Sequence, residues 1–185
     1  MEEGRISPLI LKVADVPEEG LDEQWTLTTE DFSVDTHPLP VKGAVSLAGR
    51  VYRDGKTVYF SGEVEGDLGL ECSRCLKEFP LHLKEAVTAV FMPKADLAAE
   101  AGLEEVELSG EDLDVQLYAG DDIDLYPPVR DQLALSAPMK PLCAEDCKGL
   151  CPTCGADLNE APCGCEAREA DNRFAALKKL FNKND

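Results

Sequence analysis

Eight cysteines are the residues of this chain whose type and spacing point most directly to chemistry. Two of them form an upstream pair, Cys72 and Cys75, and six lie in one late stretch between residues 143 and 165. Thiolates in short paired spacings suit tetrahedral zinc, because one tight turn aims two sulfurs at an ion and a second turn completes the site. We therefore predict two zinc ions bound by Cys72, Cys75, Cys143, Cys147, Cys151, Cys154, Cys163 and Cys165.

The sharpest of these turns is Cys151-Pro-Thr-Cys154, which Gly155 follows. Glycine can adopt the left-handed backbone conformation that lets amides point at the two sulfurs. When thiolates fill all four positions around an ion, no position remains for a substrate, and such a closed zinc site is structural and not catalytic. The cysteines thus predict metal that stabilises the fold.

Two groupings of the cysteines give each ion four ligands. In the grouping that we favour, the four cysteines from 151 to 165 form one site, because the last two follow closely after Cys154. Cys143 and Cys147 then meet the upstream pair and join the two halves of the chain. The alternative grouping combines the upstream pair with Cys151 and Cys154.

Disulfides, a redox-active dithiol and iron–sulfur clusters are the competing uses of these cysteines. Disulfides belong to oxidising compartments, and the first residues show no basic region followed by an apolar run, so no signal peptide is visible and we expect a cytoplasmic protein. A thioredoxin-like pair would need a βαβ context, whereas Pro138, Pro141 and Pro152 surround Cys151 and Cys154. Iron–sulfur clusters also bind four thiolates, and spacing alone does not exclude them.

The charge of the chain is strongly acidic, with 18 basic and 37 acidic residues and a net charge of −19. Each four-thiolate zinc site would add about two more negative charges. Such a surface repels a naked phosphate backbone, so basic partners such as ribosomal proteins fit better than free nucleic acid. Residues 95–129 contain eleven acidic residues and no Lys or Arg, which is typical of a solvated loop or of a docking surface for a basic partner.

Alternating apolar residues predict a sheet in the first two thirds of the chain. An Asp-Gly turn at residues 53–56 indicates a hairpin, and the turn from Cys72 to Cys75 is expected at the tip of a second hairpin. Glycines at 62, 66 and 69 suggest bulges or bending in the returning strand. The predicted strands cover residues 5–13, 25–29, 41–51, 57–70, 79–91 and 114–118.

Helices are predicted on both sides of the late cysteines. Asp122 or Asp124 can cap the first helix, whose initial turn tolerates Pro127 and Pro128. Its apolar face has Leu125, Val129 and Leu133 at helical spacing, and Pro138 ends it. The second helix, at 173–181, is amphipathic and belongs to the one cationic segment, which contains Arg168, Arg173, Lys178, Lys179 and Lys183.

No catalytic constellation stands out. Of the two histidines, His82 lies among alternating leucines and is expected to point to solvent, and His37 lies beside a proline. Neither neighbours a plausible nucleophile, and no phosphate-binding glycine loop precedes a helix. We therefore expect a protein that is not an enzyme, with no catalytic and no cofactor-binding residues.

Several motifs together resemble the YceD-like family, the bacterial and plastid proteins called large ribosomal RNA subunit accumulation proteins. The resemblance covers roughly residues 5–182 and is most specific in the cysteine-rich block. It implies a cytoplasmic role in accumulation of large-subunit ribosomal RNA and in large-subunit assembly. The motifs are Leu70-Glu-Cys-Ser-Arg-Cys with Phe79, Val129-Arg-Asp-Gln-Leu, Pro138-Met-Lys-Pro-Leu-Cys, Asp146-Cys-Lys-Gly-Leu-Cys-Pro-Thr-Cys-Gly, Asp157-Leu-Asn and Arg173-Phe-Ala-Ala-Leu-Lys-Lys-Leu.

These observations predict an α+β protein with a curved antiparallel sheet, partly barrel-like, then a helix, a cysteine-rich zinc module and a C-terminal helix. Residues 1–121 would form the β domain, and residues 122–185 would pack with the sheet as one unit. The expected function is that of a non-enzymatic zinc-binding factor for accumulation of 23S ribosomal RNA, acting through a large-subunit precursor or a basic ribosomal protein, with weak contact to ribosomal RNA and none to membranes. The alternative is a redox-regulated zinc chaperone.

Overall fold

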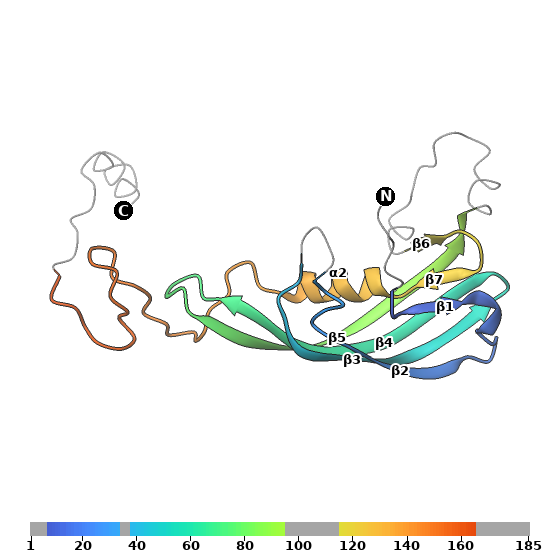
Figure 1. The fold of residues 1–185 in the computed structure, drawn as a ribbon, viewed down its shortest axis with the longest axis horizontal. Coiled ribbons are helices and arrows are strands. Elements are labelled where there is room, and N and C mark those ends of the chain that lie inside the picture. Colours follow the sequence, from blue (N-terminus) through green and yellow to red (C-terminus); the bar gives the residue numbers. More distant parts are fainter. Residues whose placement is uncertain (1–6, 34–37, 95–114, 166–185) are drawn as a thin grey trace, which may run out of the picture. The chain divides into compact units, whose positions relative to one another are not determined.

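A computed structural model of the chain describes residues 7–33, 38–94 and 115–165. Within these residues the strands form two sheets, one of β1 and β7 and one of five strands in the order β2-β3-β4-β5-β6 (Figure 1). The elements in chain order are β1 (Ile10–Lys12), a 3-10 turn (Val13–Asp15), β2 (Leu21–Leu27), β3 (Val41–Asp54), β4 (Thr57–Glu71), β5 (Glu78–Pro93), β6 (Val115–Tyr118), β7 (Asp122–Asp124) and the helix α2 (Tyr126–Ser136).

The five-stranded sheet is mixed, so the predicted antiparallel, partly barrel-like sheet was wrong in two respects. The strands β2, β3 and β4 pair in antiparallel fashion, but β6 pairs with β5 in parallel. Strands β5 and β6 are not joined by a tight turn, and the long connection allows β6 to enter the sheet in the same direction as β5. The sheet is open, because β2 and β6 are its edges and are not bonded to each other.

The hairpin of β3 and β4 forms at the predicted place. Strand β3 ends at Asp54 and pairs there with Thr57, where β4 begins, and Gly55 has a φ of +58°. Strand β4 then extends to Glu71 without interruption. Asp-Gly therefore forms the hairpin turn that the sequence predicted, since such turns require a residue that tolerates positive φ.

The sheet irregularity lies on β3, opposite one of the three glycines of β4 that predicted bulges. The register shifts between Lys42 and Ser46, which face Asp67 and Glu65 with Gly66 between them. A Cβ atom on Gly66 would lie 2.7 Å from Cγ2 of Val45. At Gly62 the register is regular, because this residue pairs directly with Gly49.

The hydrophobic core lies between the inner face of the sheet and α2. Residues at alternate positions of β3, β4 and β5 are buried, and α2 covers them, as Figure 1 shows for the arrangement of helix and sheet. The predicted apolar face of α2 is confirmed: Val129, Leu133 and the N-cap residue Leu125 are each 0% exposed. Leu9, directly before β1, and Ile123 of β7 complete this core and are also buried.

Helix α2 begins much as predicted, with Pro127 and Pro128 in its first turn. The N-cap residue is Leu125, which has no side-chain cap hydrogen bond, so neither Asp122 nor Asp124 occupies the predicted cap position. Asp124 lies one residue earlier, and its Oδ1 atom accepts a hydrogen bond of 2.9 Å from the backbone N–H of Tyr126. Asp122 instead lies in β7, paired with Lys12. The helix ends at Ser136, before the predicted stop at proline.

Other predicted elements differ in their bounds or lie outside the described residues. The opening strand is shorter than 5–13, and the second strand starts four residues earlier than predicted, at Leu21. The C-terminal helix at 173–181, the cationic residues from Arg168 to Lys183, His37 and most of the acidic run fall outside the described residues. Among the residues that are described, no helix is long and apolar enough to cross a membrane.

The contacts divide the chain into two compact units. Unit 1 comprises residues up to Leu70 together with Glu78–Pro141, and it contains the sheet and α2. Unit 2 comprises Glu71–Lys77 together with the chain from Leu142 onward. All eight cysteines belong to unit 2.

Candidate metal centres

The tip of the hairpin between β4 and β5 presents the upstream cysteine pair. The backbone N–H of Cys72 donates to the carbonyl of Lys77 at 2.9 Å, and the N–H of Leu76 donates to the carbonyl of Cys72 at 2.9 Å. Leu76 has a φ of +60°, the only positive φ of a non-glycine residue among those described. This conformation is uncommon for a residue other than glycine, and it occurs in the turn that holds the sulfurs of Cys72 and Cys75 within 4.8 Å of each other.

Site 1 consists of Cys72, Cys75, Cys143 and Cys147, whose four sulfurs all lie within 4.8 Å of one another. The Sγ atoms of Cys72 and Cys147 are 3.8 Å apart, and those of Cys75 and Cys143 are 3.6 Å apart. Four sulfurs bound at about 2.3 Å to one tetrahedral ion lie about 3.8 Å from each other. The spacing of the sulfurs therefore fits a single tetrahedral ion.

Site 2 consists of Cys151, Cys154, Cys163 and Cys165, whose sulfurs also lie within 4.8 Å of one another. The backbone N–H of Gly155 donates to the carbonyl of Cys151 at 2.9 Å, and Gly155 has a φ of +74°, as the sequence predicted. The N–H of Thr153 points at Sγ of Cys151 at 3.4 Å. The cysteines thus group in the first of the two ways considered from the sequence, and all eight are free of disulfides.

The two sites differ in how deeply their sulfurs are buried. In site 1, Cys72, Cys75 and Cys147 are buried and only Cys143 is exposed. In site 2, Cys151 is the one buried ligand, and Cys154 is exposed. A reagent in solution therefore reaches site 2 more easily than site 1.

Neighbouring amides and thiols shift the pKa values of the cysteines in opposite directions. The backbone N–H of Cys143 lowers the pKa of Cys72 to about 6, and the backbone N–H groups of Cys154 and Thr153 lower the pKa of Cys151 to about 6. Conversely, the pKa of Cys143 is raised to about 12, because its thiol bonds to Cys75 and is partly desolvated. In each site one thiolate is ready at neutral pH, and a cation must displace protons from other thiols.

Unit 2 also contains polar side chains that support site 1 without being cysteines. Nη1 of Arg74 donates to the carbonyls of Cys147 at 2.8 Å and Glu145 at 3.1 Å. Nδ2 of Asn159 donates to Sγ of Cys147 at 3.4 Å. Lys77 lies 2.8 Å from Asp157, an ion pair that lowers the pKa of this carboxyl group. Sequence reasoning did not assign these roles, although Asp157-Leu-Asn was among the motifs of the resemblance.

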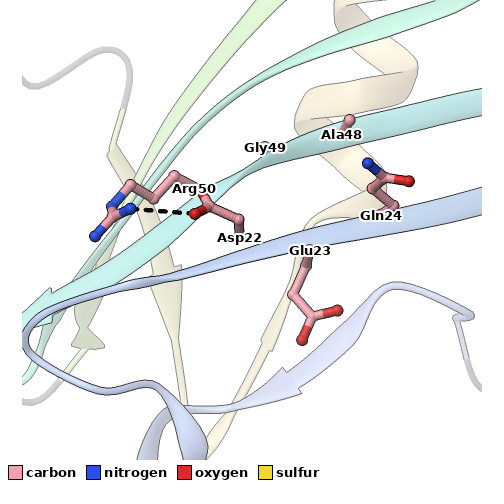
Figure 2. Close-up of a pocket in the computed structure, with 6 residues that line it drawn as sticks. All are labelled: Asp22, Glu23, Gln24, Ala48, Gly49 and Arg50. Carbon is pink, nitrogen blue, oxygen red and sulfur yellow. Dashed lines mark hydrogen bonds and ion pairs between the residues drawn. The ribbon is translucent and has the colours of Figure 1, made fainter.

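Away from the cysteines, Figure 2 shows a shallow pocket on the outer edge of the sheet, at β2 and β3. Arg50 in this pocket forms an ion pair of 3.2 Å with Asp22 and bonds to the carbonyl of Glu19. His82 is exposed, as predicted, and its Nδ1 lies 2.9 Å from Asp67. The pocket is lined by Asp22, Glu23, Gln24, Ala48, Gly49 and Arg50, and it contains no nucleophile beside a base.

Comparison with known proteins gives a family match that includes both sites. A family model described as "Large ribosomal RNA subunit accumulation protein YceD" matches residues 60–181. No solved structure matches the chain.

Among curated relatives, an uncharacterized protein of Mycobacterium tuberculosis is 34% identical over 71% of this chain, which spans 59% of that protein's length. An uncharacterized protein of Bacillus subtilis, YlbN, is 29% identical over 76% of both chains. A chloroplastic protein of Arabidopsis thaliana, "Large ribosomal RNA subunit accumulation protein YCED homolog 1", is 36% identical over 32% of this chain and 18% of its own length.

Proposed function

Because this chain belongs to the YceD family of large ribosomal RNA subunit accumulation proteins, we propose that it is a non-enzymatic factor for accumulation of the 23S ribosomal RNA, stabilised by two zinc ions. It acts in the bacterial cytoplasm during assembly of the large subunit. The observation that carries this proposal is the family match over residues 60–181, which includes all eight cysteines.

Zinc is the proposed metal because of the ligand type and the sulfur spacing. Zinc binds four thiolates in a tetrahedron at structural sites. An iron–sulfur cluster with several irons distributes its cysteine ligands over different irons, whereas the four sulfurs of each site here lie within 4.8 Å of one another, which suits a single ion. With all four positions filled by thiolates, the metals have no open position for a substrate, and their proposed role is to fold unit 2.

The proposed partner is a basic ribosomal protein or a large-subunit precursor that contains one. The net charge of −19, increased by two four-thiolate sites, disfavours direct binding to a phosphate backbone. The same charge attracts a basic protein at long range. Contact with ribosomal RNA itself is therefore proposed to be weak.

Two parallel measurements test this proposal. Sedimentation of a cell lysate should place the protein with large-subunit precursors, and the association should weaken as salt rises, because ions screen the attraction between acidic and basic surfaces. Filter binding to naked large-subunit RNA at physiological salt should be weak. Tight, salt-resistant binding to naked RNA with no particle or protein partner would contradict the proposal.

A redox-regulated chaperone is the second candidate, and the exposure of Cys143 and Cys154 favours it. An oxidant that reaches one ligand of each site would eject the metal and unfold unit 2. The test is treatment with peroxide, measurement of released zinc, and a holdase assay on an aggregating client protein. Strong holdase activity that depends on oxidation would favour the chaperone function over the proposed function as an accumulation factor.

A further inference from the structure

Residues 156–160, which we call the return segment, lie between the second and third ligands of site 2, and three of their side chains contact either the site 1 ligand Cys147 or Lys77 at the hairpin tip. The segment begins directly after the Cys151–Gly155 turn, and Cys151 donates its backbone N–H to the carbonyl of Ala156 at 2.8 Å. It then runs antiparallel to Leu150, which bridges to Asp157, and Leu158 donates to the carbonyl of Gly149 at 2.9 Å. The return segment therefore packs on the chain that connects the two sites.

Asn159 contacts site 1 through both ends of its amide. Its Nδ2 atom donates to Sγ of the ligand Cys147 at 3.4 Å, and its Oδ1 atom accepts from the backbone N–H of Lys148 at 2.8 Å. The side chain is itself oriented by Asp157, whose Oδ1 accepts from the backbone N–H of Asn159 at 2.8 Å and from Nδ2 at 2.7 Å. A hydrogen bond to a metal-bound thiolate reduces its negative charge and fixes its position.

Lys77 joins the same segment to the hairpin tip of site 1. Its Nζ atom lies 2.8 Å from Oδ2 of Asp157, whose side chain is only 10% exposed, and 2.7 Å from Oε1 of Glu160. The carbonyl of Lys77 also accepts the N–H of the ligand Cys72. The return segment thus reaches both cysteine segments that make site 1, through Lys77 on one and Cys147 on the other.

We propose that metal at site 2 secures metal at site 1, with Asn159 as the positioning residue that couples them. This inference rests on the proposed binding of metal at both sites. When site 2 is loaded, Cys154 and Cys163 anchor the return segment at both ends, so Asn159 stays against Cys147. When site 2 is empty, the segment loses both anchors and becomes free to move. Placing Asn159 against Cys147 then costs conformational entropy, whereas binding of metal at site 2 has already paid this cost in the loaded form.

The test measures how fast the site 1 cysteines become open to a thiol reagent in the zinc-loaded protein. An excess of chelator and N-ethylmaleimide is added, and mass spectrometry follows alkylation of Cys72 and Cys147. Asn159→Ala should raise the alkylation rate about tenfold, the lower end of what loss of such a hydrogen bond costs in metal affinity. The double substitution Cys163→Ser with Cys165→Ser, which removes site 2, should raise it at least as much.

The combined triple variant decides whether Asn159 carries the coupling. Adding Asn159→Ala to the protein without site 2 should give no further increase, because residues that act through one contact are not additive. Rates that multiply in the triple variant would contradict the proposal, and so would an unchanged rate in the protein without site 2. Gln24→Ala, an exposed amide on β2, is the matched control and should leave the rate unchanged.

A second variant covers the case in which the triple variant does not fold. Asp157→Asn keeps the size of the side chain but removes the ion pair with Lys77 and loosens Asn159, so alkylation of Cys72 and Cys147 should again accelerate. Hydrogen exchange of residues 147–151 should rise with it, and unchanged exchange and alkylation would overturn the coupling. Wild-type protein that contains no metal after purification would instead refute the proposed function. Failure of the coupling can therefore be distinguished from failure of the proposed function.

Discussion

The sulfurs of Cys75 and Cys143 lie 3.6 Å apart although 68 positions separate these residues in the chain. One comes from the hairpin tip between β4 and β5, and the other follows α2. Site 1 therefore closes a long loop of the chain. A metal ion that bridges the two sulfurs offsets much of the entropy that closing this loop costs. Unit 2 is therefore expected to depend on metal for its folding.

The first prediction concerns the number of metal ions. Protein purified without added metal should contain two zinc equivalents per chain and little iron by elemental analysis, because two separate sets of four sulfurs are present. Cys75→Ser should reduce the content toward one, since a site with three thiolates binds more weakly. A wild-type content near one, or a predominance of iron, would contradict this assignment.

The second prediction concerns pH. Cys143 and Cys165 have pKa values raised to about 12, so both carry protons in the metal-free protein at pH 6–8 and must lose them on binding. Since protons and metal compete, affinity should rise with pH by about tenfold per unit for each proton displaced. Below pH 6 the dependence should steepen, because Cys72 and Cys151, with pKa values of about 6, then also hold protons. Competition with a chelator at several pH values measures the metal affinity. An affinity that does not change with pH would count against ligation by thiolates.

The third prediction compares two glycines with the same backbone conformation. Gly149 and Gly155 have φ values of +73° and +74°, but only at Gly149 would a Cβ atom meet backbone, at 2.8 Å from the carbonyl oxygen of Arg74. Gly149→Ala should therefore accelerate metal release and hydrogen exchange in unit 2 clearly more than Gly155→Ala, whose cost is about 1–2 kcal/mol from the left-handed conformation alone. Equal effects would mean that the close approach of residue 149 to Arg74 is not important.

The fourth prediction compares two leucines of α2. Leu133 is 0% exposed and packs in the core of unit 1, whereas Leu135 is 81% exposed. Leu133→Ala should lower the free energy of unfolding by about 2–5 kcal/mol, because it removes buried methyl groups and leaves a cavity. Leu135→Ala should change it by less than about 0.5 kcal/mol. Urea denaturation followed by circular dichroism checks both, and a large effect of Leu135→Ala would indicate that this side chain is covered in solution.

Local sequence signals predicted the elements that depend on few residues. The Asp54-Gly55 turn and the spacing of Leu125, Val129 and Leu133 both led to the observed structure, because turn chemistry and helical periodicity act over short distances. The cysteine grouping was favoured on spacing alone, and the sulfurs are found in that grouping.

Features that depend on tertiary pairing were not predictable. Strand β2 begins at Leu21, although its acidic residues have low β-propensity, because pairing with β3 from Leu21–Val51 onward outweighs that preference. It ends early because Asp31 accepts from the backbone N–H and the hydroxyl of Thr28. The parallel pairing of β6 with β5 and the contact of Asn159 with Cys147 join residues that no local periodicity relates.

We propose that this chain supports accumulation of the large-subunit ribosomal RNA and that it needs its two cysteine sites to do so. The most direct measurement is the ratio of 23S to 16S ribosomal RNA in cells that lack the gene and are complemented with wild-type protein, with Cys75→Ser and Cys151→Ser combined, or with the control Gln24→Ala. We predict that the ratio falls on deletion, and that wild type and Gln24→Ala restore it whereas the double cysteine variant does not. An unchanged ratio on deletion, or full restoration by the cysteine variant, would contradict the account.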